Sequence, residues 1–445
     1  MSRIPSFKSF ICAGLLLFFS ASSLADSQEQ TNPEALITIN PSVTYQTITG
    51  WEGVCQAGQF FPYFTKIKEE LFDKIVDLGI NRLRMEAHGG LERLEPLSMS
   101  EPKTWFRIEN DNRDSSRIRP EGFQFQLLDQ QIEDIVLPLK KRLEARGETL
   151  VLNLTYVNFG KTFFHRDHSK EYAEFMLAIF LHLKEKYGFV PDLIEVILEP
   201  DHKFAGWNAD HIADAIKSTS KVLALHGFRP GFVAPSVMNM DNAVAMFDEL
   251  MRDSDVRKVL VEFSYHRYIT SDKALIQIGE RARKYGIQTA MLEHIGSSYK
   301  DLHDDLKTGY CSSWEQYTLA FPAKKDNGGA YFRIDDTDPD NPGIVMGKRT
   351  PFLRQYFRYI RKDAVRIDAT SSDPIFDPLA FVNKNGNQVV VIKSTGKGNV
   401  RIEGLSPGAY GVSYGPDTPE DQLELTEQPF LVRIPQHSVV TIYRK

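Results

Sequence analysis

The sequence predicts an α/β protein, a (β/α)8 barrel followed by a smaller all-β sandwich domain. Between residues 47 and 361, short apolar segments alternate with amphipathic stretches of helix length, a pattern typical of parallel strands joined by helices. The apolar segments number eight, which is the strand count of a closed barrel. From residue 362 to 445 the helical stretches give way to short alternating segments separated by turn residues, as in a sandwich.

The eight apolar segments are the expected barrel strands. In chain order they cover residues 47–50, 81–85, 150–154, 193–198, 231–234, 259–263, 288–292 and 310–314. The helices expected between them cover 66–78, 127–145, 169–187, 209–225, 243–252 and 272–285, and a last helix covers 350–361. An open doubly wound sheet is the alternative, but no G-x-G-x-x-G turn follows the first strand. The barrel is therefore preferred.

The segments that flank the barrel have different patterns. Residues 1–25 combine a positively charged start, a short apolar run and small residues at the end, which predicts a cleaved signal peptide and a secreted or periplasmic protein. Residues 26–46 form a lead with short strands that we expect to join the sandwich, since no helix separates them from it. Within the sandwich, Asn385-Gly386 between two strands predicts a tight hairpin.

Composition excludes several classes of protein. The chain of 445 residues is 42% hydrophobic and 25% charged, as in ordinary globular proteins, and its net charge of −6 gives no basic field for nucleic acid. After the signal segment, no apolar run is long enough to span a membrane. The two remaining cysteines, Cys55 and Cys311, are too few for a disulfide framework; we expect buried thiols, with a single disulfide as the alternative.

Two glutamates stand where a barrel places its chemistry. Glu199 follows the fourth predicted strand and Glu293 follows the seventh, and active sites of barrels form at the carboxyl ends of the strands. We expect the two carboxylates to face each other across the barrel mouth. Such a pair suits glycoside cleavage, in which one group protonates the leaving oxygen and the other attacks or activates water. The alternative for each residue alone is a helix-capping or salt-bridge role.

Short motifs in the same order add a family resemblance. Glu199-Pro200, the segment 45–51 around the first strand, the segment 263–268 at the sixth, and the passage 356–367 into the side domain resemble retaining glycoside hydrolases of clan A, nearest to family 30. The resemblance implies a double-displacement β-glycosidase without a cofactor, with Glu199 as acid/base and Glu293 as nucleophile. The family usually has Asn before the acid/base, where it binds the sugar 2-hydroxyl, whereas this chain has Leu198.

Further residues are expected to bind the substrate. Flat indole faces stack on sugar rings, and all the tryptophans fall at predicted strand ends or loops. Arg84 is expected to reach Glu293, or else to pair with Glu86, and Tyr268 to donate a hydrogen bond to Glu293. The acid/base should carry a raised pKa and the nucleophile should be ionised. The expected set is Trp51, Arg84, Trp105, His165, Trp207, His266, Tyr268 and Trp314.

The loops at the predicted barrel mouth are rich in basic residues. These are Arg107, Arg113, Arg117, Arg119, Lys161, His165, Arg166, His168, Lys170, His202, Lys203 and Arg267. Arginine forks suit sulfate and carboxylate groups, so an anionic or sulfated saccharide is an expected substrate. Ordinary surface pairing with Glu109, Asp111 and Asp114 is the alternative.

Two other functions fit the same scaffold. A metal-dependent barrel hydrolase would use His165, His168, His202 and His266, although the first strand offers no ligand, so no metal site is predicted. A catalytically silent carbohydrate-binding protein would keep the cleft and release no reducing ends. A carbohydrate substrate is the expected partner of the leading function; the sugar and its linkage are not specified by the sequence.

Overall fold

The computed structural model of the protein describes residues 35–89, 114–119, 122–159, 164–203, 205–415 and 429–445. The predicted signal peptide, Trp105, Arg107, Arg113 and Lys161 lie outside these residues.

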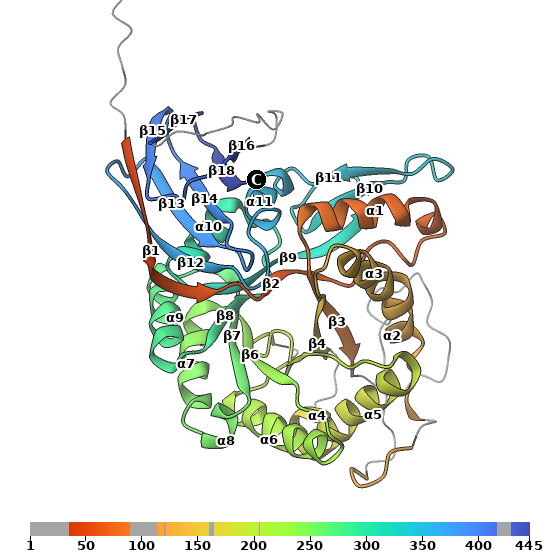
Figure 1. The fold of residues 1–445 in the computed structure, drawn as a ribbon. Coiled ribbons are helices and arrows are strands. Elements are labelled where there is room, and N and C mark those ends of the chain that lie inside the picture. Colours follow the sequence, from red (N-terminus) through yellow and green to blue (C-terminus); the bar gives the residue numbers. More distant parts are fainter. Residues whose placement is uncertain (1–34, 90–113, 120–121, 160–163, 204, 416–428) are drawn as a thin grey trace, which may run out of the picture.

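Within the described residues, eight parallel strands close into a barrel, as predicted. The closure is complete because β9 pairs with both β2 and β8. Figure 1 shows the strands around a common axis with helices outside them. The barrel strands are β2(Gly50–Val54), β3(Arg82–His88), β4(Val151–Val157), β5(Leu193–Glu195), β6(Gly231–Asn239), β7(Leu260–Ile269), β8(Gln288–Met291) and β9(Cys311–Pro322).

Several barrel strands differ from the prediction, and β6, β7 and β9 continue beyond their predicted ends to Asn239, Ile269 and Pro322. The first begins at Gly50 rather than at residue 47, because β1(Ala35–Thr47) continues in the other sheet up to Thr47. The fourth barrel strand, β5, ends at Glu195, three residues before the predicted end. In addition, β10(Ala330–Asp335) and β11(Gly343–Met346) extend the sheet beyond β9 and were not predicted. The sequence of this segment has the pattern of a loop, and its strands form only by pairing with β9 and with each other.

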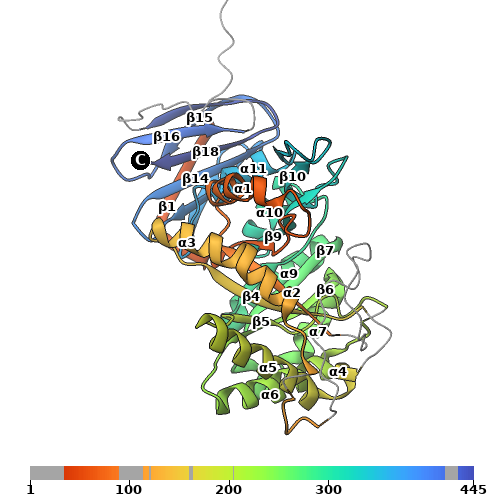
Figure 2. The ribbon, with the colours of Figure 1, turned by 90° about the vertical axis from the view of Figure 1, so that its right-hand side faces the viewer.

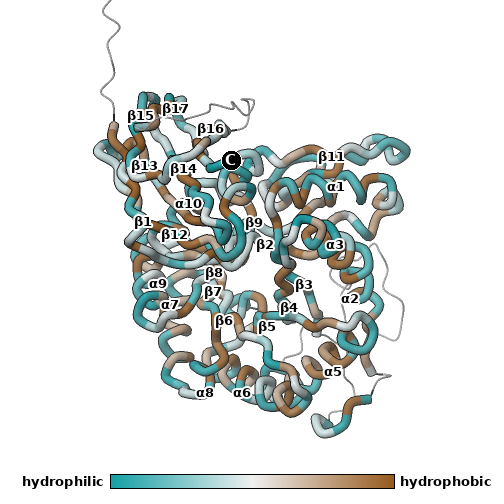
Figure 3. The backbone as a smooth tube through the Cα atoms, viewed as in Figure 1, coloured by the Kyte–Doolittle hydropathy of each residue, from teal (hydrophilic) through white to brown (hydrophobic). Residues whose placement is uncertain are grey.

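The helices pack around the barrel by one apolar face. In α6, for example, the buried residues Ile212, Ile216, Thr219 and Leu223 recur every three or four positions, and Asn208 closes the first turn by a capping box. Figure 3 shows brown and teal alternating along these helices, as a single buried face requires. The helices are α1(Phe64–Leu78), α2(Gln126–Gln131), α3(Leu137–Ala145), α4(Phe164–Asp167), α5(Ser169–Tyr187), α6(Ala209–Leu225), α7(Met240–Leu250), α8(Ser254–Arg257), α9(Asp272–Tyr285), α10(Tyr299–Lys307) and α11(Thr350–Phe357).

The predicted helix 127–145 contains a π turn. It is formed by α2, the π segment Ile132–Val136 and α3 in one continuous run. Pro138 lies at the start of α3 and lacks the N–H that would bond to the carbonyl of Asp134. The missing donor explains why the regular α pattern is interrupted just before it.

The second sheet lies on one side of the barrel (Figures 1 and 2). Its described strands have the order β16-β18-β14-β13-β12-β1-β15-β17, and all pairs are antiparallel except β1 with β15. The predicted hairpin is present, since Val382 of β13 pairs with Gln388 of β14 and Gly386 has a φ of 84°. The remaining strands are β12(Val365–Ser371), β13(Phe376–Val382), β14(Gln388–Ser394), β15(Gly398–Glu403), β16(Tyr410–Tyr414), β17(Phe430–Ile434) and β18(Val439–Arg444).

The two faces of this sheet serve different cores. Along β14, Val389 and Val391 belong to the core of the barrel and its helices, whereas Val390 and Ile392 belong to the internal core of the curled sheet. Successive side chains of a strand point to opposite faces, so the alternation is what the strand geometry demands. The sheet is therefore packed firmly against the barrel through one face.

Two other predictions concern the chain as a whole. Cys55 and Cys311 are both buried and free. Among the described residues, the helices are all too short or too polar to cross a bilayer.

Candidate active site

Glu199 lies on a loop that departs from the barrel ladder. After β5 ends, the chain stays attached to both neighbouring strands, because Leu198 N donates to Tyr156 O at 2.9 Å and Glu199 N donates to Ser236 O at 3.1 Å. Glu199 has a φ of 49°, a left-handed conformation that costs a non-glycine residue free energy. Its side chain is 11% exposed and opens on the barrel mouth. Strain held at this position fits a functional side chain.

Glu293 follows β8 and is fixed from two sides. Arg84 Nη1 donates to its Oε2 at 2.9 Å, and the Tyr268 hydroxyl donates to its Oε1 at 2.8 Å. Both contacts are those expected from the sequence, and the alternative pairing of Arg84 with Glu86 is not the one found. The two donors hold Glu293 in one orientation and favour its ionised form.

His266, on β7, brings the two glutamates into one cluster. Its Nδ1 lies 3.2 Å from Glu199 Oε1, and the imidazole is completely buried. One ligand atom from each of Glu199, His266 and Glu293 lies within 4.8 Å of the other two. The predicted pair of carboxylates therefore does meet at the barrel mouth, with an imidazole beside it.

The electrostatics of the pair are the reverse of those expected from the sequence. Burial acts to raise the pKa of Glu199, but the hydrogen bond and charge of His266 outweigh it and leave that pKa below its ordinary value. Burial raises the pKa of Glu293, and the opposing pull of His266 and Arg84 is not sufficient to cancel it. The prediction of a raised pKa for Glu199 is therefore wrong for the ligand-free protein, because His266 could not be placed beside it from sequence.

A buried layer of charge lies beneath the cluster. Arg84 donates two hydrogen bonds to Glu195, from Nε at 2.7 Å and from Nη2 at 2.6 Å. A carboxylate oxygen of Glu315 lies 3.8 Å from Nη1 of the same arginine. Arg82 bridges Glu52 at 2.7 Å and Glu262 at 2.7 and 2.8 Å. Burial raises the pKa of Glu315 well above its ordinary value, although the charge of Arg84 opposes the shift. The contacts with Glu195 fix Arg84, and Arg84 in turn holds Glu293.

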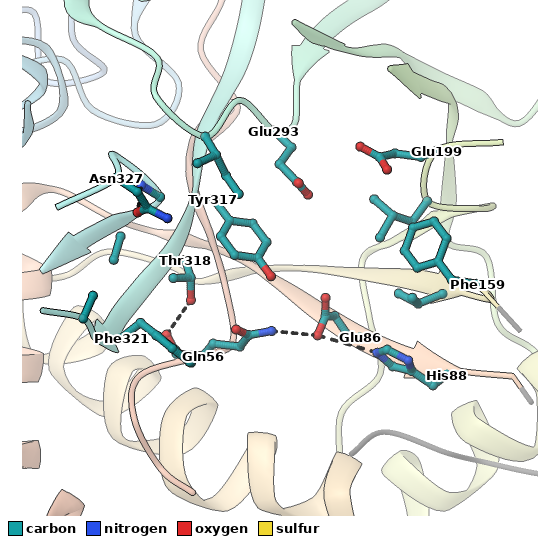
Figure 4. Close-up of a pocket in the computed structure, with 16 residues that line it drawn as sticks. Gln56, Glu86, His88, Phe159, Glu199, Glu293, Tyr317, Thr318, Phe321 and Asn327 are labelled. Atoms are coloured by element: carbon teal, nitrogen blue, oxygen red, sulfur yellow. Dashed lines mark hydrogen bonds and ion pairs between the residues drawn. The ribbon is translucent and has the colours of Figure 1, made fainter. Parts of the chain in front are cut away.

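A pocket of about 440 Å³ opens above the two glutamates. Figure 4 shows Glu293 and Glu199 on one side of it, with Glu86 and His88 from β3 and Tyr317 from β9 around the same space. Gln56, Phe159, Leu198 and Asn327 complete much of the lining. Sequence reasoning missed Tyr317 and Gln56, and treated Glu86 only as a structural partner. The signal was the two-residue spacing from Arg84 to Glu86 and from Glu86 to His88, which puts all three on one face of the strand.

The structure contradicts the expected substrate contacts of Trp51 and Trp314. Both are completely buried. Trp51 Nε1 donates to Ile360 O at 2.6 Å and its ring stacks on Phe357 at 4.6 Å, while Trp314 Nε1 donates to Asp305. These indoles pack the barrel against the last helix, because their strands continue past them before reaching the mouth.

His165 and Trp207 are also enclosed rather than exposed in the pocket. His165 Nδ1 lies 2.9 Å from the Tyr156 hydroxyl, and Trp207 packs on Tyr156 and Tyr172 with ring centroids 6.1 and 5.7 Å apart. Exposures of 6% for His165 and 4% for Trp207 leave no face for a sugar. Burial lowers the pKa of His165 to about 4. Both predictions of substrate contact are therefore wrong, and the two residues support the wall behind the site.

The basic loop residues give the pocket no cation among the residues described. Arg166 pairs with Asp167 at 2.7 Å, and Arg267 pairs with Asp305 at 2.9 Å. None of the described pocket residues is a lysine or an arginine, so the expectation of an anionic substrate has no support there. In the described chain, the set with metal-ligand spacing is Glu199, His266 and Glu293, and it does not include His165, His168 or His202.

Solved structures share this fold over most of the chain at low sequence identity. An endo-β1,6-glucanase matches with a TM-score of 0.67 and 16% identity over 92% of this chain and 94% of its own. Two family 30 glycoside hydrolases, an endoxylanase from Clostridium papyrosolvens and the catalytic domain of xylanase C from Talaromyces cellulolyticus, match with TM-scores of 0.65, at 17% and 14% identity, over 92% of this chain and 100% of theirs. Comparison with known families and with curated proteins finds no match. The fold is thus that of family 30 glycoside hydrolases, as the resemblance implied.

Proposed function

We propose that the protein is a retaining β-glycoside hydrolase, with Glu293 as nucleophile and Glu199 as acid/base. The observation that carries the proposal is the meeting of two buried carboxylates within 4.8 Å at the mouth of a barrel of this fold. Retaining enzymes hold their carboxyl groups about 5–5.5 Å apart, whereas inverting enzymes need about 6.5–9.5 Å to admit a water. The observed spacing supports direct attack by a carboxylate.

Glu293 suits the role of nucleophile because two hydrogen-bond donors orient its carboxylate and stabilise its negative charge. Arg84 and Tyr268 each donate to one of its oxygens, so the group that attacks the sugar is already oriented. Bond formation at the anomeric carbon then displaces the leaving oxygen and gives a covalent glycosyl-enzyme. Water releases the sugar in the second step.

Glu199 suits the acid/base when it is considered together with His266. The two groups lie 3.2 Å apart, and the hydrogen bond with His266 lowers the pKa of Glu199 in the ligand-free protein. A sugar that fills the pocket removes water from Glu199 and favours uptake of a proton by this carboxylate. Glu199 then donates it to the leaving oxygen and recovers a proton from the incoming water.

The sequence supports an extracellular setting for this activity, because residues 1–25 have the pattern of a cleaved signal peptide. A secreted or periplasmic enzyme acting on an oligo- or polysaccharide is the form of the proposal that we favour. The first test is a screen of reducing-end release from a panel of β-linked polysaccharides, followed by NMR of the first-formed product. Retention of the β anomer is expected, and an α anomer as first product would refute the mechanism.

Variants assign the two roles. Glu293→Gln should abolish turnover while saccharide binding and the melting temperature stay near those of the parent protein. Glu199→Gln should slow substrates with poor leaving groups by about 100- to 10,000-fold and activated aryl glycosides much less, because only the former need the acid. Glu185→Gln, on the exposed end of α5, is the matched control. Equal losses on both substrate types would exclude the acid role of Glu199.

The metal-dependent alternative uses the same three groups. A cation held by Glu199, His266 and Glu293 would have to displace the Arg84 and Tyr268 contacts of Glu293 and would face the positive charge of Arg84. We expect full activity after chelator treatment and dialysis, and loss of activity that zinc restores would favour the metal enzyme. Saccharide binding without any release of reducing ends would instead identify a silent binding protein.

A further inference from the structure

The charged groups that line the pocket in the described chain are mainly acidic. Besides the two glutamates of the proposed mechanism there is a third carboxylate, Glu86, at the end of β3. Gln56 Nε2 donates to Glu86 Oε2 at 3.1 Å, and His88 Nε2 lies 3.7 Å from the same oxygen. The proposed mechanism does not use Glu86.

Glu86 is built to present one oxygen to the pocket. The residue is 7% exposed, and its backbone is locked by a pair of 3.0 Å hydrogen bonds with the side chain of Gln131. Both side-chain contacts of Glu86 go to Oε2; Oε1 has no hydrogen-bond donor among the described residues. Figure 4 shows this carboxylate directed into the same space as Glu293, with the hydroxyl of Tyr317 turned toward Glu86.

The surroundings of Glu86 favour its ionised form. Although burial opposes ionisation, the hydrogen bond and charge of His88 and the charge of Arg84 lower the pKa of Glu86 below its ordinary value. Arg84 itself is shared by Glu195 and Glu293, so it has little charge left for a third partner. His88 approaches Oε2 of Glu86, at 3.7 Å, so Oε1 stays open to the pocket. A cationic ligand that reaches Oε1 would add a charge-assisted hydrogen bond to this carboxylate.

We propose that the pocket recognises an amino sugar and that Glu86 binds its protonated amine through Oε1. An ammonium group offers three donors and a full charge, and its hydrogen bond to a carboxylate is about twice as strong as a neutral one. A hydroxyl could donate to the same oxygen, but it would leave the charge uncompensated. The inference rests on the proposed glycosidase function and names its substrate class.

The test compares saccharides that differ only in the charge of one substituent. The probes are β-linked oligosaccharides of glucosamine and of galactosamine, the same oligosaccharides after N-acetylation, and the corresponding neutral glucose and galactose oligosaccharides. Hydrolysis gives kcat/KM, and titration calorimetry gives Kd independently of turnover. Both are measured on the parent protein, on Glu86→Gln and on the control Glu185→Gln, which removes the same charge from an exposed position on α5.

We expect at least one amine series to be preferred over its N-acetylated form by tenfold or more. Glu86→Gln should reduce binding and kcat/KM for the amine by about 10- to 100-fold, the loss of one hydrogen bond to a charged group, and change the uncharged series by less than about threefold. Glu185→Gln should change neither. The preference should also fade as pH rises through the titration of the amine itself.

Each other outcome has a definite meaning. Equal losses on charged and uncharged saccharides would show that Glu86 binds hydroxyls, and an absence of any amine preference in the parent protein would overturn the inference even if Glu86→Gln failed to fold. Hydrolysis of neutral glycosides without amine preference would contradict the amino-sugar inference and leave the glycosidase proposal standing. Amine-selective binding without hydrolysis would support the amine site and contradict the glycosidase proposal.

Discussion

Removal of one hydroxyl group tests how the nucleophile is kept ionised. Tyr268 is half-buried on β7 and donates to Glu293 Oε1 at 2.8 Å. Burial and the charge of Glu293 raise the pKa of Tyr268 well above its ordinary value, so the hydroxyl remains a donor over the whole working range of pH. Tyr268→Phe deletes this donor and retains the ring, which packs on His266 and His294 with centroids 6.2 and 5.8 Å away.

The expected shift follows from the strength of that bond. A hydrogen bond to a charged group contributes about 1.5–3 kcal/mol, and one pKa unit corresponds to about 1.36 kcal/mol, so the pKa of Glu293 should rise by about 1–2 units. The sign is upward because the hydroxyl stabilises only the ionised carboxylate, and burial already raises the pKa of Glu293. Attack requires the ionised form. The acidic limb of kcat/KM against pH should therefore move to higher pH by the same amount.

The assay is the pH profile of kcat/KM on an activated aryl glycoside. The control is Tyr187→Phe, which removes a 2.8 Å bond to Glu133 outside the barrel and should leave the profile unchanged. Thermal melting of both variants checks the fold. An acidic limb that stays in place, or that moves to lower pH, would refute the assignment of Tyr268 as the donor that supports the nucleophile.

The remaining predictions concern the charge beneath the site and the wall behind it. Glu195→Gln should move the acidic limb in the opposite direction, to lower pH, because Arg84 would then neutralise Glu293 alone; breaking this buried pair should also lower the free energy of unfolding in urea by about 3–5 kcal/mol. His165→Asn should lose less stability than the parent protein at acidic pH. The pKa of His165 is about 4 in the folded protein against 6.5 for an ordinary histidine, so protonation of this residue favours the unfolded state. In the parent protein it should leave the free energy of unfolding unchanged above pH 6.5 and lower it by about 3 kcal/mol in total as pH falls toward 4. Urea unfolding at pH 7 and pH 4.5 measures the difference, and an equal loss in both proteins would contradict it.

The barrel and the two central carboxylates were accessible from the sequence because both are encoded locally. Strand and helix periods appear in windows of about 10 residues, and the carboxyl ends of parallel strands must converge on one face. Glu199 and Glu293 could therefore be placed together although 93 residues separate them. Arg84 and Tyr268 could be connected to Glu293 by the same reasoning, since both lie on strands of the same barrel.

The tryptophans show where local pattern stops being informative. Trp51 lies within the first barrel strand, but only the packing of Phe357 and Ile360, about 300 residues later, decides that its indole is buried against the last helix and not open at the mouth. The exposure of a residue at a strand end depends on which distant segments of the chain pack against it, and sequence pattern within a short window does not contain that information.

The charges of the site were likewise decided by tertiary structure. The pKa of Glu199 depends on an imidazole brought to 3.2 Å from another strand, and the open oxygen of Glu86 depends on which partners reach its carboxylate. Coulomb and desolvation energies change steeply over a few ångströms, a distance that sequence spacing does not resolve. The sequence by itself determined which residues stand at the barrel mouth, and the folded structure decided which of them are ionised, which are enclosed, and which one remains open to a ligand.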